Sequence, residues 1–145
     1  MKVRTIAEDD LPRCAQLYTE IYGATSYQES WTYGIALARL TELWTNCAGS
    51  CFMAEERDRV VGFAFCSFHT WWSGKVIRID ELGVDPRLQR HGTGTTLLEH
   101  CIAAGRYLHN VSAIEVVSPR TPPALDFYSS SGFQSGGREL LSRRL

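Results

Sequence analysis

With 145 residues, of which 44% are hydrophobic, the chain has the length of one domain and enough apolar side chains to form a core. Its formal net charge of −1 excludes the strongly basic balance of most nucleic-acid-binding domains, so we expect no nucleic-acid partner. No apolar run approaches the roughly 18 residues of a membrane helix, and the N-terminus lacks the apolar core of a signal peptide. We therefore expect one cytoplasmic domain over residues 1–145, with no membrane partner.

The first half of the chain has the pattern of a strand, two helices and a β-hairpin. The strand covers Val3 to Ala7. Asp9 or Asp10 then begins a helix that has Pro12 in its first turn and ends at Gly23. The remaining elements of this half are a helix over about 31–46 and strands over 51–56 and 60–69, joined by the charged turn 57–59.

The second half alternates strands with helices, which indicates a βαβ unit and therefore a pair of parallel strands. The elements are strands over 75–84 and 112–117, helices over 92–108 and 124–131, and two short strands within 133–145. The hairpins before and after the βαβ unit predict antiparallel pairing. The predicted fold class is thus α/β (α+β): a mixed, mostly antiparallel sheet of six to seven strands with a central parallel pair, flanked by about four helices.

Five cysteines are scattered through apolar segments, and their odd number indicates reduced, buried thiols rather than a disulfide framework. An alternative is a zinc site formed by Cys47, Cys51, Cys66 and His69. These spacings match no common zinc finger, and Cys66 lies in a strand-like run. We predict no metal.

Two glycines, Gly92 and Gly94, stand where the helix over 92–108 begins. A glycine inside a helix costs about 1 kcal/mol relative to alanine, so two of them suggest that something approaches the backbone closely. The N-terminus of a helix binds anions through its free N–H groups, and glycine leaves those groups uncovered. The stretch is a candidate diphosphate site made of Gln89, Arg90, His91, Gly92, Thr93, Gly94 and Thr95, of which His91 would contribute its backbone.

Three phosphate-binding motifs compete for this stretch. A P-loop needs a lysine that is absent, and a dinucleotide-binding fingerprint needs a third glycine where Leu97 stands, although an acidic residue, Glu115, follows about twenty residues later. The third pattern is Q/R-x-x-G-x-G/A, with Gln89, Gly92 and Gly94 at its fixed positions.

In this third pattern the sequence resembles the GCN5-related N-acetyltransferase (GNAT) family. ELGVDPRLQRHGTGTTLL, residues 81–98, is similar to the family's central strand, phosphate loop and long helix. ALDFYSSSGF, residues 124–133, is similar to its later helix. The two matches lie about thirty residues apart, in the expected order. One departure is Arg120-Thr-Pro-Pro, which stands where the family often has an asparagine that contacts the cofactor.

The resemblance implies the GNAT fold, with acetyl-CoA as acetyl donor and co-substrate. It places the pantetheine arm along Leu82, Gly83 and Val84, where a main-chain N–H would stabilise the oxyanion of a tetrahedral intermediate. Tyr128 matches the family's general acid, which gives a proton to the departing thiolate.

The acceptor amine needs a base, and the resemblance leaves three candidates. Asp80 matches an aspartate with a catalytic role in some aminoglycoside 6′-acetyltransferases, Glu81 is its neighbour, and Glu115 matches an acidic position of some ribosomal-protein acetyltransferases. Strand alternation predicts that only one of Asp80 and Glu81 faces the cleft. Several family members have a glutamate base where this chain has Arg78, and ordered water serves others, so a single base is not required.

The family's acceptor site is formed by the first two helices and the loop between the third and fourth strands. These regions carry many aromatic residues and two carboxylates: Tyr22, Tyr27, Trp31, Tyr33, Trp71, Trp72, Glu20 and Glu29. They suit a cationic amine, either a small molecule such as an aminoglycoside or polyamine, or a peptide amine. Trp71 and Trp72 could equally cover the core or contact a second copy in a homodimer. The alternative function is a non-catalytic module that binds acyl-CoA, because a fold does not fix a function. An NAD-binding oxidoreductase is a third reading, which the missing glycine disfavours.

Overall fold

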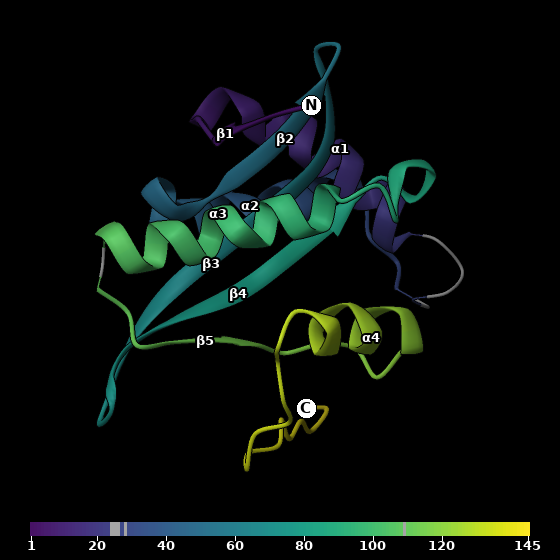
Figure 1. Ribbon diagram of the computed structural model, residues 1–145. Helices are drawn as coiled ribbons and strands as arrows, with labels where there is room; N and C mark the ends of the chain where they lie inside the picture. The colour runs from purple at the N-terminus through teal and green to yellow at the C-terminus, as the bar shows by residue number, and fades with distance from the viewer. Residues whose placement is uncertain (24–26, 28, 109) are drawn as a thin grey trace.

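The computed structural model describes residues 1–23, 27, 29–108 and 110–145. These residues form a five-stranded sheet in the order β1-β2-β3-β4-β5 (Figure 1). The strands are β1 Lys2–Thr5, β2 Phe52–Glu56, β3 Arg59–Trp71, β4 Gly74–Val84 and β5 Ala113–Val116. The helices are α1 Leu11–Tyr22, α2 Tyr33–Cys47, α3 Thr93–Leu108 and α4 Pro122–Ser130.

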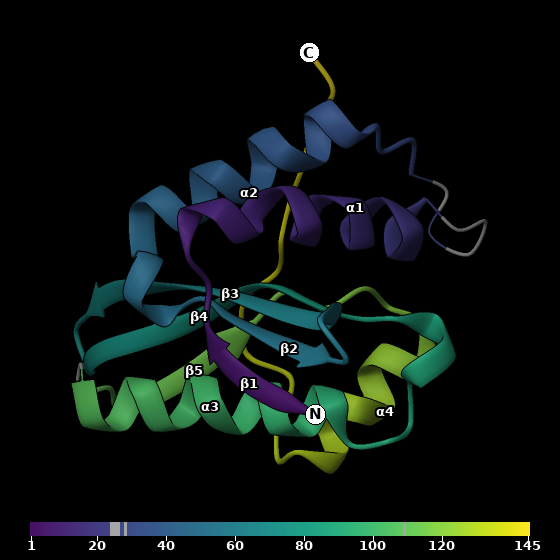
Figure 2. The ribbon, with the colours of Figure 1, turned by 90° about the horizontal axis from the view of Figure 1, so that it is seen from above.

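The helices cover both faces of the sheet, with α1 and α2 on one face and α3 and α4 on the other (Figure 2). Each face has its own apolar core because successive side chains of β3 point to opposite faces. Phe63 and Phe65 are buried on the α1/α2 side, and Ala64 and Cys66 on the α3 side. Two predicted features, a mixed sheet with one parallel pair and four helices around it, are confirmed.

Strand β4 is the element that creates a candidate site, because it is longer than its parallel partner. Strand β5 pairs with β4 only from Val76 to Ile79. β4 continues to Val84 with no partner from β5, while β3 pairs with it on the other side. The two parallel strands therefore separate at Asp80, and backbone groups of 80–84 face the gap.

The C-terminal prediction is wrong: the described segment 133–145 contains no strand, so the sheet has five strands and not six to seven. The segment lacks the alternating apolar residues that would bury one face of a strand. Its leucines Leu140 and Leu141 are adjacent and exposed. The parallel pair consequently lies at the edge of the sheet, not at its centre.

Several helix boundaries also differ from the predicted ones, among them the starts of α3 and α4. α3 begins at Thr93 because Gly92 has φ of +85°, which lies outside helical backbone space. α4 begins at Pro122, since proline fits the first helical turn. Among the described residues, no helix is long and apolar enough to cross a membrane. Nor does any group of three or more His, Cys, Asp and Glu side chains within this part of the chain form a metal-binding cluster.

Candidate active site

Asp80 stands in a β-bulge where the parallel strands separate. Phe65 of β3 is paired with Glu81 and Cys66 with Ile79, so Asp80 is the extra residue of β4. Its Oδ2 atom is buried and accepts no hydrogen bond from any described residue. A buried acceptor without a partner costs free energy, and such atoms concentrate at functional sites. The bulge also interrupts the strict alternation from which opposite orientations of Asp80 and Glu81 were predicted.

Glu81 follows the bulge and is held from the α1/α2 side. Tyr18 of α1 donates its hydroxyl to Glu81 Oε1 across 3.1 Å, and Arg39 Nε of α2 donates to the same oxygen across 3.2 Å. Burial raises the pKa of Glu81 above its ordinary value, and Arg39 and Tyr18 oppose that rise. One turn after Tyr18, Tyr22 donates its hydroxyl to the carbonyl oxygen of Leu82 across 3.2 Å. Helix α1 thus contacts β4 on both residues after the bulge.

Tyr128 approaches the same region from α4. Its ring packs edge-on against Phe127 and Phe133, with centroids 5.0 and 5.3 Å apart. Burial raises the pKa of Tyr128 to about 12, and the charge of Glu81 contributes to the rise. The phenol is therefore protonated at neutral pH and can donate a proton. The neighbouring Phe127 ring and Val84 Cγ2 would lie 3.4 and 3.6 Å from a Cβ on Gly94, so α4 lies beside the end of β4.

The predicted phosphate loop has uncovered amides at the N-terminus of α3. Thr96 N donates to Gly92 O across 2.9 Å, which is the first bond of the helix. The N–H groups of Thr93, Gly94 and Thr95 lie in the first turn of the helix, where no intrahelical carbonyl is available to them. Arg90 and Gly92 both have positive φ, of 65° and 85°, which turns the chain sharply before the helix. The loop therefore offers the N–H groups of the first helical turn and the positive end of a helix dipole to an anion.

Close approach to the backbone was the reason predicted for Gly92 and Gly94, and the structure agrees with it only in part. A Cβ on Gly92 would meet no atom within 4 Å, so its φ is what requires glycine there. A Cβ on Gly94 would lie 3.4 Å from the Phe127 ring. The protein group that approaches Gly94 most closely is thus a side chain of α4.

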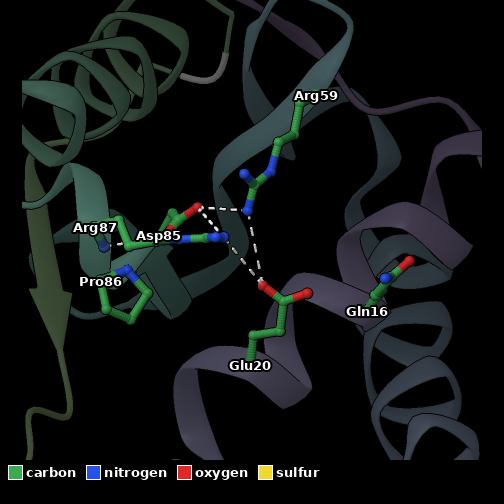
Figure 3. Close-up of a pocket in the computed structure, with 6 residues that line it drawn as sticks. All are labelled: Gln16, Glu20, Arg59, Asp85, Pro86 and Arg87. Carbon is green, nitrogen blue, oxygen red and sulfur yellow. Dashed lines mark hydrogen bonds and ion pairs between the residues drawn. The ribbon is translucent and has the colours of Figure 1, made fainter.

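Asp85, which the sequence marked only as the end of a strand, anchors this loop (Figure 3). The side chain is fully buried and accepts hydrogen bonds from Arg87 N at 3.0 Å, Arg87 Nη2 at 2.9 Å and Arg59 Nη2 at 2.8 Å. Glu20 of α1 lies 3.6 Å from Arg87 and 3.9 Å from Arg59. These side chains line a pocket of about 540 Å³. They connect the beginning of the phosphate loop to β3 and α1.

Glu115, the third base candidate, is engaged elsewhere. Arg78 Nη2 lies 2.6 Å from Glu115 Oε1, and Arg138 Nη2 lies 3.1 Å from Oε2. Arg138 also stacks over the Trp71 ring at 4.7 Å. Through its contact with Arg138, Glu115 fixes the C-terminal segment against the sheet.

The aromatic residues predicted for the acceptor side fall into two groups. Trp71 lies at the end of the β3–β4 hairpin, roughly 20 Å along β4 from Glu81 at 3.3 Å per residue. Trp72, next to it, is 91% exposed. The other group adjoins Glu81: Tyr18 packs on Tyr22 at 4.4 Å and on Trp31 at 4.8 Å.

This second group also contains Tyr27, whose ring lies 5.1 Å from that of Tyr22, and Glu29, which accepts a hydrogen bond from Trp31 Nε1. Tyr33 is exposed. Tyr18 and Arg39 were missed by the sequence analysis, because helical spacing marks Tyr18 as core and Arg39 as surface. Only the contact with β4 distinguishes them.

Tyr128 also lines a cavity of about 1120 Å³ between α3, β5, α4 and the C-terminal segment. Its lining is mixed, with apolar residues such as Ile102, Ile114 and Phe133 beside Arg106 and Arg120. This space lies beside the β5 edge, where a further strand was predicted and none formed.

Comparisons with known proteins agree with this geometry. The family model for the Acetyltransferase (GNAT) family matches residues 11–133. Among curated proteins, the sequence has no match. Among solved structures, a protein from Pyrococcus horikoshii OT3 is 24% identical, with a TM-score of 0.78 over 95% of this chain and 91% of that one.

Two aminoglycoside acetyltransferases have the same fold at lower identity. The apo form of the aminoglycoside 6′-N-acetyltransferase AAC(6′)-IG from Acinetobacter haemolyticus is 14% identical, with a TM-score of 0.77 over 100% of this chain and 99% of that one. The aminoglycoside N-acetyltransferase AAC(6′)-Iy, solved with CoA, is 17% identical, with a TM-score of 0.78 over 99% and 93%. At these identities the likeness concerns the fold.

Proposed function

Because the chain belongs to the acetyltransferase (GNAT) family, whose members use acetyl-CoA, we propose that it is a cytoplasmic enzyme that transfers the acetyl group of acetyl-CoA to a primary amine. The observation that carries this proposal is the convergence of three elements on one gap. The bulge of β4 lies where β4 and β5 separate, and the Gly94 loop before α3 lies close to both Val84 of β4 and Phe127, the neighbour of Tyr128 on α4.

The residues present fit acetyl-CoA. The diphosphate would be held by backbone N–H groups of the loop, because a helix N-terminus favours negative charge. The loop residues are Gln89, Arg90, His91, Gly92, Thr93, Gly94 and Thr95. Leu82, Gly83 and Val84 have no β5 neighbour and would hydrogen-bond the pantetheine amides as an added strand does. Acetyl-CoA supplies the activated acyl group as a thioester.

The chain's own groups would then handle the charge and protons. A backbone N–H beside the bulge stabilises negative charge on the thioester oxygen. An N–C bond forms and a C–S bond breaks, and Tyr128 gives its proton to the sulfur. The ammonium form of the acceptor loses two protons in all. One replaces the proton of Tyr128, and the other passes to Asp80, Glu81 or water. Asp80 is the first candidate because its Oδ2 has no other described partner.

The proposed acceptor is an amine that binds between α1, α2 and the bulge. The aromatic rings of Tyr18, Tyr22 and Trp31 support this placement, with Glu81 beside them. Cations bind well to such aromatic and carboxylate surroundings.

Two copies could also pair as a homodimer, since the outer edge of β5 has no strand partner among the described residues. Size-exclusion chromatography with light scattering would then give twice the mass of one chain, and the monomer mass would reject the dimer.

A thiol-release assay tests the function. Purified protein is mixed with acetyl-CoA and a panel of amines, and acetylated products are identified by mass spectrometry. We expect turnover with at least one amine, and at least a tenfold lower kcat for Tyr128→Phe. Tyr107→Phe is the matched control, because Tyr107 is 87% exposed on α3.

Calorimetry with CoA separates the alternatives. Binding of CoA without turnover of any amine, or indifference to Tyr128→Phe, would favour a non-catalytic acyl-CoA-binding module. If neither CoA nor acetyl-CoA binds, both the acetyltransferase and the non-catalytic module are rejected.

A further inference from the structure

Arg39 is the one positively charged side chain that contacts Glu81 among the described residues. Only its Nε atom is used, in the 3.2 Å contact with Glu81 Oε1. Neither terminal nitrogen, Nη1 or Nη2, donates a hydrogen bond to a described residue, and the side chain is 36% exposed. The paired edge of the guanidinium, which matches a carboxylate, is therefore open.

Glu81 likewise uses only one of its two carboxylate oxygens in hydrogen bonds with described residues. Oε1 accepts from both Tyr18 and Arg39. Oε2 accepts from no described residue, yet it is not among the buried unpartnered atoms, so solvent reaches it. An open anionic oxygen and an open cationic edge thus lie side by side within a single ion pair, next to the bulge that carries Asp80.

The two open groups differ in the ligand they favour. A polycation would place an ammonium on Glu81 but bring further positive charge toward Arg39. A simple amine would leave the edge of Arg39 without a partner. An amine that carries its own carboxylate on the neighbouring carbon satisfies both groups, and the aromatic rings of Tyr18, Tyr22 and Trp31 offer a surface for its side chain.

We propose that the acceptor is an α-amino acid, whose carboxylate is bound by Nη1 and Nη2 of Arg39 and whose ammonium is bound by Oε2 of Glu81. This inference rests on the proposed acetyltransferase function and names its substrate class. Arg39 is then a residue that determines specificity without touching the thioester.

The test compares acceptors that differ in one charge. Values of kcat/KM are measured for a set of α-amino acids, for their carboxamides, for spermidine and for an aminoglycoside, with product identified by mass spectrometry. We expect at least a tenfold preference for the best amino acid over its own carboxamide. The amine of a carboxamide loses its proton more readily, so a difference in basicity alone would give the opposite order.

The Arg39→Met variant locates the effect. It should raise KM for the amino acid at least tenfold and change kcat less than threefold. KM for the carboxamide should stay unchanged, so the ratio of kcat/KM for the acid to that for the carboxamide falls toward one. Arg39→Lys should restore only part of it, because lysine keeps the charge but lacks the paired edge. Arg143→Met is the control, since Arg143 is exposed in the C-terminal segment.

The outcomes separate this inference from the function beneath it. Turnover of spermidine or the aminoglycoside with no preference for amino acids would overturn the inference and leave the acetyltransferase function intact. An unchanged preference in Arg39→Met would also overturn it. No turnover of any amine would reject both. If Arg39→Met failed to fold, the wild-type comparison of acid and carboxamide would decide alone.

Discussion

Arg59 Nη2 lies 2.8 Å from the Oδ2 atom of Asp85, a side chain that is fully buried although both of its arginine partners are exposed. This contact joins the beginning of β3 to the turn after β4. A charge withdrawn from water in this way depends on its partners for stability. The beginning of the phosphate loop is consequently fixed by an ion pair in addition to the apolar packing of Leu88.

Replacing Asp85 with asparagine should therefore reduce both stability and donor binding. The carboxylate would lose its charge-assisted bonds to Arg59 and Arg87, each typically a strong kind of hydrogen bond. We expect a loss of about 2 kcal/mol in the free energy of unfolding, measured by urea denaturation, because the exposed arginines stay hydrated. The dissociation constant for CoA should rise at least fivefold by calorimetry.

Glu20→Gln is the matched control for this prediction. Glu20 touches the same arginines at 3.6 and 3.9 Å but is 44% exposed, so a change below about 1 kcal/mol is expected. Equal effects of the two variants would contradict the special role of the buried carboxylate.

A second prediction concerns Gly83, where β4 crosses beneath α1. An added Cβ would lie 2.7 Å from Phe63 Cζ and 2.9 Å from Ile21 Cδ1. Because Phe63 is fully buried, the ring has little space to move. Gly83→Ala should lower the free energy of unfolding by about 2 kcal/mol and displace the backbone proposed to bind pantetheine, which weakens CoA binding.

Gly34→Ala in α2 provides the comparison, because a Cβ there meets no atom within 4 Å. Alanine favours helix, so this variant should keep or raise the melting temperature. A stable Gly83→Ala protein with unchanged CoA affinity would show that the strand has room the structure does not indicate.

The sequence predicted the parts of the site that depend on local pattern. The glycines of the loop and the F-Y-x-x-x-G-F run around Tyr128 carry their signal within a few residues. The bulge at Asp80 has no local sequence signal, because it arises from the register between β3 and β4. Arg39 and Tyr18 meet Glu81 from 42 and 63 residues away, so only the packing of α1 and α2 on the sheet shows their role.

The prediction of C-terminal strands is wrong for a related reason, because contacts between distant residues fix this segment. Short apolar segments after a turn often form strands, but here Arg138 fixes the segment to Glu115 and Trp71. Leu140 and Leu141 remain exposed.

A third prediction concerns acid stability and the pair Arg4–Asp10. Arg4 Nη1 lies 2.6 Å from Asp10 Oδ2, and this hydrogen bond holds the pKa of Asp10 below its ordinary value of about 3.9. A depressed pKa adds stability that is fully present above the unfolded pKa and is lost as the pH falls through the folded one. Wild-type protein should therefore lose stability between about pH 5 and pH 2.

Asp10→Asn should remove this contribution. We expect about 2 kcal/mol less stability at pH 7 and a shallower decline in acid, measured by denaturation at several pH values. The decline persists in part because Arg4 also lowers the pKa of Glu55. Parallel curves for the two proteins would contradict the assignment. Asp9→Asn, on an exposed neighbouring residue, should behave as wild type.

The last prediction separates the two carboxylates at the bulge by their effect on the pH profile. Burial raises the pKa of Glu81, so this group becomes protonated above the usual range near 4.3 as the pH falls. If ionised Glu81 binds the acceptor ammonium, kcat/KM should fall on the acid side at that raised pKa. Glu81→Gln should abolish this limb and raise KM while kcat changes little.

Asp80→Asn should instead lower kcat at least tenfold, because the partner of Oδ2 would be a reacting proton. Tyr128, with its pKa raised to about 12, should add no alkaline limb below about pH 11. A lower kcat in Glu81→Gln with KM unchanged would exchange the two roles and make Glu81 the base.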